Sequence, residues 1–184
     1  MAYTAPTTRT TGTLITASIY NTDLVDNISY LYSKSIKQIV NTTDGAVATG
    51  TTTIPFDDTI PQNTEGTQFM SLAITPLSAT SKLIIQVVLN ASYSAQTEFT
   101  VALFQDTTAS ALAAVSQQVS LYNGAVDPNN MKINHYMTSG TTSATTFKVR
   151  AGGSAAGTVT FNGQSAARKL GGVMSSSITI TEYF

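Results

Sequence analysis

The chain has 184 residues, of which 42% are hydrophobic and 10% are charged, and its formal net charge is −1. The hydrophobic fraction excludes an intrinsically disordered chain, and the lack of a Lys or Arg cluster argues against nucleic acid as a partner. Because ordinary soluble domains contain roughly 25% charged residues, this threonine- and serine-rich composition favours a protein that packs against other chains.

The chain contains no cysteine, so neither disulfide bonds nor thiolate metal sites can form. The N-terminus lacks the basic start and apolar run of a secretory signal. Uninterrupted apolar stretches such as Ala111–Val115 are far shorter than the roughly 20 residues that span a bilayer. We therefore expect a soluble protein, made in a cytoplasm and not inserted in a membrane, with one hydrophobic core and a short appendage.

Residues 1–15 are rich in threonine, contain Pro6 and Gly12, and show no hydrophobic periodicity. This composition predicts an extended arm that has no core of its own. Such an arm requires a partner to become ordered.

The segment after the arm has the pattern of an amphipathic helix. Ile19, Leu24, Ile28 and Leu31 fall on one helical face, which predicts a helix from Thr22 to Lys34. This apolar stripe packs either on the chain's own domain or against copies of itself. Since it covers only about one and a half heptads, it is too short to hold copies together alone.

The polar residues around this helix agree with its direction. Asn21 or Thr22 is the expected N-cap, and Asp23 and Asp26 lie in the first turn, where carboxylates favour the positive end of the helix dipole.

After Lys37 the hydrophobic period changes to two, which is typical of β-strands. The segments that alternate are Gln38–Asn41, Thr51–Phe56, Gln68–Thr75, Leu83–Ser92, Glu98–Gln105, Val115–Leu121, Met131–Met137, Thr145–Ala151, Thr158–Asn162 and Ser177–Phe184. Turn sequences such as Asp44-Gly45 and Gly171-Gly172 separate them. About eight to ten short strands predict a mainly β fold, an antiparallel β-sandwich or jelly roll over residues 41–184, preceded by the arm and helix over residues 1–40.

Two strands have informative patterns. Residues 83–89 are apolar at nearly every position, which predicts a central strand that is buried on both faces. In the last strand Ile178 and Ile180 point to one face together with Phe184, so we expect Phe184 to be buried.

Few residues suit catalysis. The only histidine, His135, shares a strand face with Ile133 and Met137, which favours a core or interface role. If copies meet on a symmetry axis, several His135 side chains could instead line a metal or anion site. Asp57 and Asp58 are adjacent carboxylates whose expected role is turn capping; a Ca²⁺ site and a loop at a subunit junction are the alternatives.

The glycine-rich loops also lack catalytic features. Gly152–Gly157 has no following helix or lysine, as a phosphate cradle requires, so we expect a flexible strand connection, and the same holds for Gly171-Gly172. Arg168-Lys169 is expected at a solvated loop tip. We therefore expect no catalytic, cofactor-binding or metal-binding residues.

Three tyrosines near loops, Tyr93, Tyr122 and Tyr136, are candidates for stacking against sugars. Ordinary packing is the expected role, since the chain has no tryptophan and no cluster of tyrosines that would form a dedicated platform.

Several segments resemble a known family. Residues 12–31, with the pattern Asn-x-x-Leu-Val-x-Asn-Ile from Asn21 to Ile28, resemble the N-terminal segment of tailed-phage virion appendage and structural proteins. Segments of the body are similar to the C-terminal knob domains of such proteins, namely Thr53–Gly66, Phe147–Gly152 and Phe161–Tyr183.

This resemblance implies a homotrimer in which the N-terminal arm attaches to the virion. A jelly-roll head of the tumour necrosis factor type would project outward. The chain has no shaft repeat between the helix and the head, so both a tail and a capsid position remain open.

We therefore expect a non-enzymatic phage virion structural protein, a homotrimeric fibre, knob or capsid decoration protein that residues 1–40 anchor to other virion proteins. The alternative is a lectin-like tip module that binds host-surface glycans through loops such as Asn123–Asn130 and Gly152–Gly157. A hydrolase that uses His135 or Asp57 and Asp58 is disfavoured, because the groups that a site needs are scarce and scattered.

Overall fold

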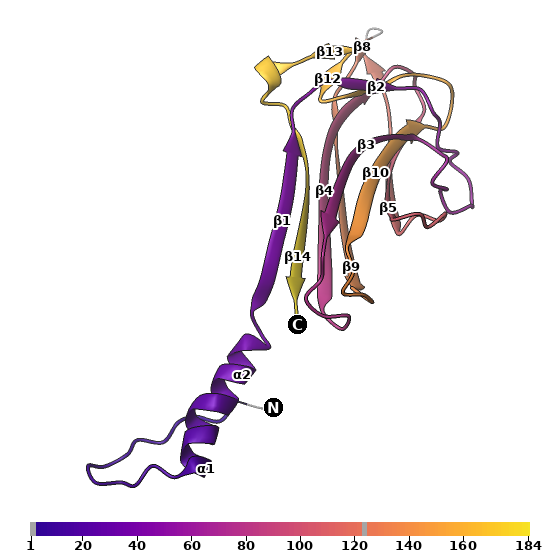
Figure 1. Cartoon of the computed structure of the whole chain (residues 1–184). Helices are drawn as coiled ribbons and strands as arrows, with labels where there is room; N and C mark the ends of the chain where they lie inside the picture. The colour runs from indigo at the N-terminus through magenta and orange to yellow at the C-terminus, as the bar shows by residue number, and fades with distance from the viewer. Residues whose placement is uncertain (1–2, 123–124) are drawn as a thin grey trace.

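Two layers, each with four long strands, form a β-sandwich in a computed structural model of the chain, which describes residues 3–122 and 125–184 (Figure 1). The first layer contains, in spatial order, β1 (Ile36–Asp44), β14 (Ser176–Tyr183), β4 (Lys82–Tyr93) and β9 (Asn129–Thr138). The second layer contains β3 (Thr67–Ile74), β10 (Thr145–Gly153), β5 (Glu98–Gln105) and β6 (Ala113–Gln118).

The pairing of these eight long strands follows one rule. β1 pairs with β14, β3 with β10, β4 with β9 and β5 with β6, all antiparallel. Among the long strands, the first therefore pairs with the last, the second with the seventh, the third with the sixth and the fourth with the fifth. A long antiparallel hairpin rolled into two sheets has this arrangement, so the predicted jelly roll is confirmed.

Short elements close the end of the sandwich that lies away from the helix (Figure 1). β11 (Val159–Phe161) continues the first sheet beside β4, and β2 (Ala48–Gly50) pairs with β11. The other short elements are the ribbons β7–β8 (Leu121–Tyr122 and Ala125–Val126) and β12–β13 (Gly163–Gln164 and Ala167–Arg168), and the 3₁₀ turn η2 (Leu170–Gly172).

One helix projects from the opposite end of the sandwich (Figure 1). It consists of α1 (Ala17–Tyr20), the π-helical segment η1 (Asn21–Asp26) and α2 (Asn27–Tyr32). The predicted start at Thr22 was wrong, because the Thr16 hydroxyl accepts a hydrogen bond from the Ile19 backbone N–H and caps an earlier turn. The helix ends at Tyr32, and β1 begins at Ile36.

The predicted strand at residues 51–56 was wrong. These residues form an irregular segment whose Ile54 backbone N–H donates to the Gly153 carbonyl, while the Thr53 carbonyl accepts from Gly66. Pro55 has no N–H to donate to a ladder, so it disfavours a regular strand at this position.

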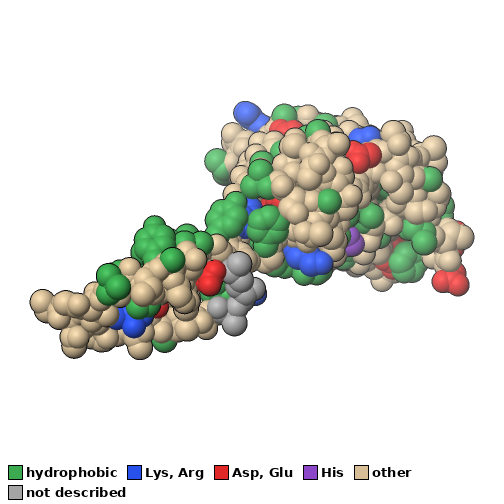
Figure 2. Space-filling view, turned by 60° about the horizontal axis from the view of Figure 1, so that its bottom comes forward, with side chains coloured by type: hydrophobic (Ala, Val, Ile, Leu, Met, Phe, Trp, Pro, Cys, Tyr) green, Lys and Arg blue, Asp and Glu red, His purple; other side chains and the backbone are tan. Residues whose placement is uncertain are grey.

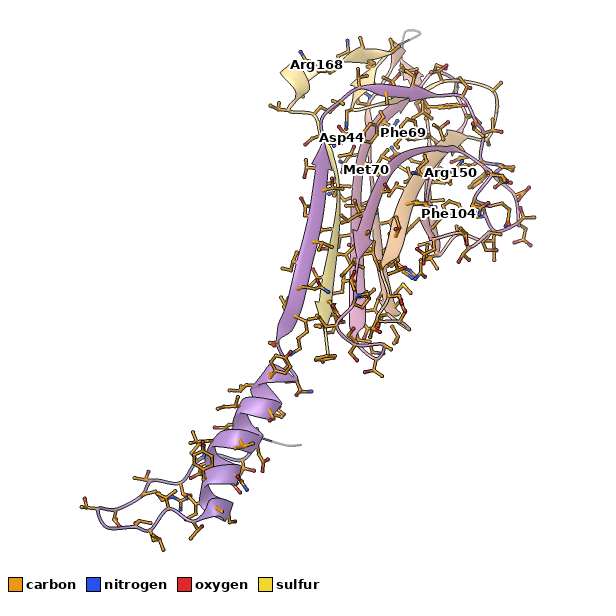
Figure 3. The ribbon with its side chains drawn as sticks, viewed as in Figure 1. Asp44, Phe69, Met70, Phe104, Arg150 and Arg168 are labelled. Atoms are coloured by element: carbon orange, nitrogen blue, oxygen red, sulfur yellow. The ribbon has the colours of Figure 1, made fainter. Side chains whose placement is uncertain are left out.

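The segment 51–66 covers the outer face of the second sheet. Ile54 packs there on Ala102 and Phe104, which are fully buried although they point away from the sandwich interior. Arg150 fastens the segment by donating hydrogen bonds to the carbonyls of Glu65 and Gly66, both at 2.7 Å. Figure 3 shows Phe104 and Arg150 on this side of the molecule.

The main core lies between the two sheets. Four of its aromatic residues stack in two pairs, Tyr93 on Phe99 at 5.7 Å and Phe69 on Phe161 at 5.2 Å between ring centroids. The inward residues of β4 are fully buried in this core, namely Leu83, Ile85, Val87 and Leu89.

The outward face of β4 differs from the prediction of a strand buried twice. Ile84 and Val88 are only half-buried and Gln86 is exposed, because no described segment covers this face. The apolar run in the sequence therefore marks a surface that the isolated chain leaves partly open.

The C-terminal end also differs from the prediction. Phe184 is 38% exposed, since β14 ends at Tyr183 and Phe184 rests against the Tyr32 ring, 6.4 Å away between centroids. The last inward position of β14 belongs to Glu182, which is fully buried.

Glu182 organises the turn between β3 and β4. Its carboxylate accepts hydrogen bonds from the Ser81 hydroxyl, the Gln38 amide and the backbone N–H groups of Leu77 and Ser78. Burial alone would raise the pKa of Glu182, but these hydrogen bonds outweigh it and lower the pKa below its ordinary value of 4.5.

A lowered pKa makes Glu182 a source of stability that depends on pH. The contribution is present above the pKa of the unfolded chain and is lost as pH falls through the lower pKa of the folded chain. We expect Glu182→Gln to lower the free energy of unfolding by about 2 kcal/mol at pH 7, because an amide N–H₂ then faces groups that donate. The difference between wild type and variant should shrink below pH 4, as measured by urea unfolding at both pH values.

The exposed Asp58 provides the control for this measurement. Asp58→Asn should leave the free energy of unfolding within about 0.5 kcal/mol of wild type at pH 7. A Glu182→Gln variant as stable as Asp58→Asn at pH 7 would contradict the role given to Glu182.

Candidate subunit interface

The helix exposes its apolar stripe. Leu24 is exposed, Ile28 is 62% exposed and Leu31 is 61% exposed, and Val25 and Tyr32 lie exposed beside them. Packing of the stripe on the chain's own domain, one of the two expected arrangements, was therefore wrong. Figure 2 shows hydrophobic side chains along the helix and around its junction with the body.

The N-terminal arm lies on a different, polar side of the helix. The Thr4 backbone exchanges hydrogen bonds with the Asn27 side chain at 3.1 and 2.7 Å, and Arg9 forms an ion pair with Asp23 at 2.7 Å. Because the arm occupies this side, it leaves the apolar stripe open.

The junction between the helix and the body is aromatic. The Lys37 ammonium lies over the rings of Tyr32 and Phe184, at 3.1 and 4.7 Å from their centroids. Such cation–π contacts help to hold the direction in which the helix leaves the sandwich.

The outer face of the first sheet is a second open surface. Strand register places Ile39, Thr181, Ile84 and Tyr136 in one row across β1, β14, β4 and β9. Ile39 and Tyr136 are exposed, and Tyr136 contacts the Tyr183 ring at 6.1 Å between centroids. Strand alternation alone does not predict this face, although the second apolar face of residues 83–89 is a signal for it.

The neighbouring row on this face consists of amides and a hydroxyl. It contains Asn41, Thr179, Gln86 and Asn134. Asn41 donates to the Thr179 hydroxyl at 2.8 Å, and Gln86 donates to Asn134 at 3.2 Å. These uncharged side chains therefore satisfy part of their hydrogen bonding within the sheet, and the cores of protein interfaces are likewise poor in charge.

His135 lies where the sequence predicted, on the inward side of β9 with Ile133 and Met137, opposite Ile85 of β4. Burial lowers the pKa of His135, which favours the neutral imidazole. In the part of the chain that the structure describes, no group of three or more His, Asp or Glu side chains is placed to hold a metal ion.

Asp57 caps a turn, as predicted. Its carboxylate accepts hydrogen bonds from the Thr59 hydroxyl at 2.6 Å and from the Thr59 backbone N–H at 2.8 Å, and these bonds lower the pKa of Asp57. Asp57, Thr59 and Phe56 also line a shallow cavity of about 270 Å³ beside β6. None of these contacts turns the carboxylates of Asp57 and Asp58 toward each other, as a pair of catalytic acids would require.

The glycine-rich segment Gly152–Gly157, which begins at the end of β10, differs from the prediction of a flexible connection. Gly152 and Gly153 are buried within β10, and a Cβ on Gly153 would lie 2.1 Å from the Tyr93 ring. The Tyr93 hydroxyl donates to the Ala155 carbonyl, so this segment wraps around a buried tyrosine.

The other candidates are the Arg168-Lys169 pair and the three tyrosines. Arg168 is exposed in β13 at the end of the body away from the helix, where Figure 3 places it, and Lys169 adjoins it. Of the three tyrosines, Tyr93 has the predicted packing role, Tyr136 is exposed, and the side chain of Tyr122 lies outside the described residues, as do residues 123–124 of the candidate loop.

None of the helices in the described parts of the chain is both long and apolar enough to cross a membrane.

No protein family model matches the sequence, and no curated protein is significantly similar to it. Three solved structures of infectious bursal disease virus resemble the fold. The VP2 subviral particle has a TM-score of 0.32 and 11% identity, over 79% of this chain and 37% of that chain. The Gx strain structure has a TM-score of 0.33 and 15% identity, over 80% and 38%. The virus-derived T=1 particle has a TM-score of 0.32 and 16% identity, over 81% and 37%. This chain thus spans well under half the length of the proteins it resembles.

Proposed function

We propose that this protein is a non-enzymatic structural component of a tailed-phage virion. It acts as a homotrimeric fibre, knob or capsid decoration protein that residues 1–40 anchor to the particle. The observation that carries the proposal is the projecting helix, whose apolar side chains Leu24, Ile28 and Leu31 are exposed in the single chain. A contiguous apolar stripe that is exposed in the single chain marks a surface for another protein.

The chemistry of the side chains supports a structural role over catalysis. His135 packs on the core side of β9, Asp57 caps its own turn, and the buried Glu182 already accepts four hydrogen bonds. These groups lie in separate parts of the sandwich and do not converge on one cavity.

A closed ring of copies agrees with the geometry of the helix. The stripe is too short to hold two helices together by itself, so the jelly-roll bodies must supply further contact. In a cyclic trimer each helix gains two neighbours at once, and all three arms leave from the same end of the assembly.

The first test is the mass of the full chain in solution. We expect light scattering after size-exclusion chromatography to give three times the 19.3 kDa of one chain at micromolar concentration. A mass of one chain under these conditions would contradict the proposed trimer.

The second test concerns attachment. We expect the triple variant Leu24→Lys, Ile28→Lys, Leu31→Lys to lose at least about 90% of its incorporation into particles, because three ammonium groups cannot be buried in an apolar contact. Incorporation is measured by immunoblotting purified virions from cells that express the tagged variant. The matched control carries Leu170→Lys and Val173→Lys, which alter exposed apolar residues at the far end of the body.

Normal incorporation of the triple variant would show that the helix does not attach the protein. Loss of incorporation by the control as well would point to a general folding defect. Circular dichroism of both proteins separates this case from a specific loss of attachment.

Receptor binding at the far end of the body is the second candidate function. Leu170 and Val173 are exposed in the turn around η2, next to Arg168, at the end that would face outward if the helix is anchored. Loss of binding to host cells on replacing Leu170 and Val173, with attachment to the particle retained, would support this function. A glycan array with no bound sugar would oppose its lectin-like form.

A further inference from the structure

The outer faces of the two sheets differ in how far other segments of the chain cover them. The outer face of the second sheet is covered by residues 51–66, with Ile54 packed on Ala102 and Phe104. No segment within residues 3–122 and 125–184 gives the first sheet an equivalent cover, although Ile84 and Val88 point outward from its central strand. The outer face of the first sheet therefore leaves apolar side chains of its central strand without a cover from the described residues.

The residues of this outer face form four rows across the four strands. Beside the two rows already described, the register gives a row of Ile36, Tyr183, Lys82 and Thr138 and a row of Thr43, Ser177, Val88 and Lys132. These four rows contain two lysines and no carboxylate. A surface with so little charge is costly for a free monomer and suits burial against an uncharged surface of the same kind.

The size of this face matches a stable contact once the helix is added. With strands about 4.8 Å apart and about 3.3 Å per residue, four strands of eight residues cover on the order of 500 Å². The exposed side of the helix, about 24 Å long and about 10 Å wide, adds on the order of 200 Å². The sum, on the order of 700 Å² for each chain, approaches the roughly 800 Å² that a partner contributes to an interface of standard size, and a threefold ring shares it between two neighbours.

We infer that the outer face of the β1-β14-β4-β9 sheet is where copies of this chain meet, and that the occupant of the face is a second copy. This inference rests on the proposed assembly. It identifies the contact surface that must supplement the short helix. In a threefold ring, the β1 and β14 half of each face packs against the β4 and β9 half of its neighbour, so that the face is turned toward the axis. The uncharged rows of one copy then meet the uncharged rows of the next.

Single cysteines test this surface cleanly, because the chain has none of its own. Ile39→Cys and Tyr136→Cys place a thiol on the outer face, where both positions are 57% exposed in the single chain. Phe56→Cys and Ile60→Cys are matched controls on the loop that covers the other sheet, at 63% and 59% exposure. In an isolated chain the four thiols would be similarly accessible.

The measurement is the rate at which each full-length variant reacts with a maleimide carried on a bulky polymer. Each rate is divided by the rate in urea to remove differences between the thiols themselves. We expect Ile39→Cys and Tyr136→Cys to react at least about tenfold more slowly than the controls, because the assembled face excludes the polymer. Light scattering on the same samples reports the assembly.

The outcomes separate the two proposals. Slow labelling of the outer face in an assembled protein supports the inference. So does a monomeric Ile39→Cys or Tyr136→Cys variant when the wild type and the controls stay assembled. Equal rates at all four positions in an assembled protein would overturn this surface and leave the proposed assembly standing. Equal rates in a monomeric wild type would overturn both.

Discussion

The fold depends on one constraint, namely that each strand of a β-sandwich has two faces and the shared core can cover only one of them. The chain covers the other face of the second sheet with its own residues, through Ile54 on Ala102 and Phe104. It leaves the other face of the first sheet open, where Ile84 and Val88 remain half-buried. The rolled pairing of the eight long strands determines which residues share the open face, because it places β4 between β14 and β9.

This constraint connects the composition to the architecture. Threonine, asparagine and glutamine occupy one row of outward positions on the first sheet, and they form cross-strand hydrogen bonds such as the bond from Asn41 to Thr179. A row of this kind is polar enough to remain in water while a chain folds and uncharged enough to be buried afterwards. The helix likewise leaves one side open. The Thr4 backbone forms hydrogen bonds with Asn27 on the polar side, and the apolar side has no cover from the described part of the arm.

Most of the strands could be predicted from alternation, and the errors have physical causes. Residues 51–56 alternate like a strand, but Pro55 interrupts a ladder and Ile54 serves a second, smaller core. The helix begins earlier than predicted because the hydroxyl of Thr16, and not the side chain of Asn21 or Thr22, caps its first turn. Phe184 was expected inside because alternation was extended past the end of β14, where Glu182 takes the last inward position. The burial of Glu182 does not follow from a pattern of hydrophobicity, since its hydrogen bonds come from Gln38 of β1 and from the turn before β4.

The sequence by itself determined the mainly β class, the arm and helix at the N-terminus, the packing of His135 on a strand face and the capping role of Asp57. These features follow from local periodicity and from side chains that bond to neighbouring backbone. Only the tertiary structure decided that the helical stripe stays exposed, that one sheet is covered by a loop and that Ile39 and Tyr136 share a row. Those facts depend on which strands become neighbours, and contacts between segments far apart in the chain leave no trace in a local pattern.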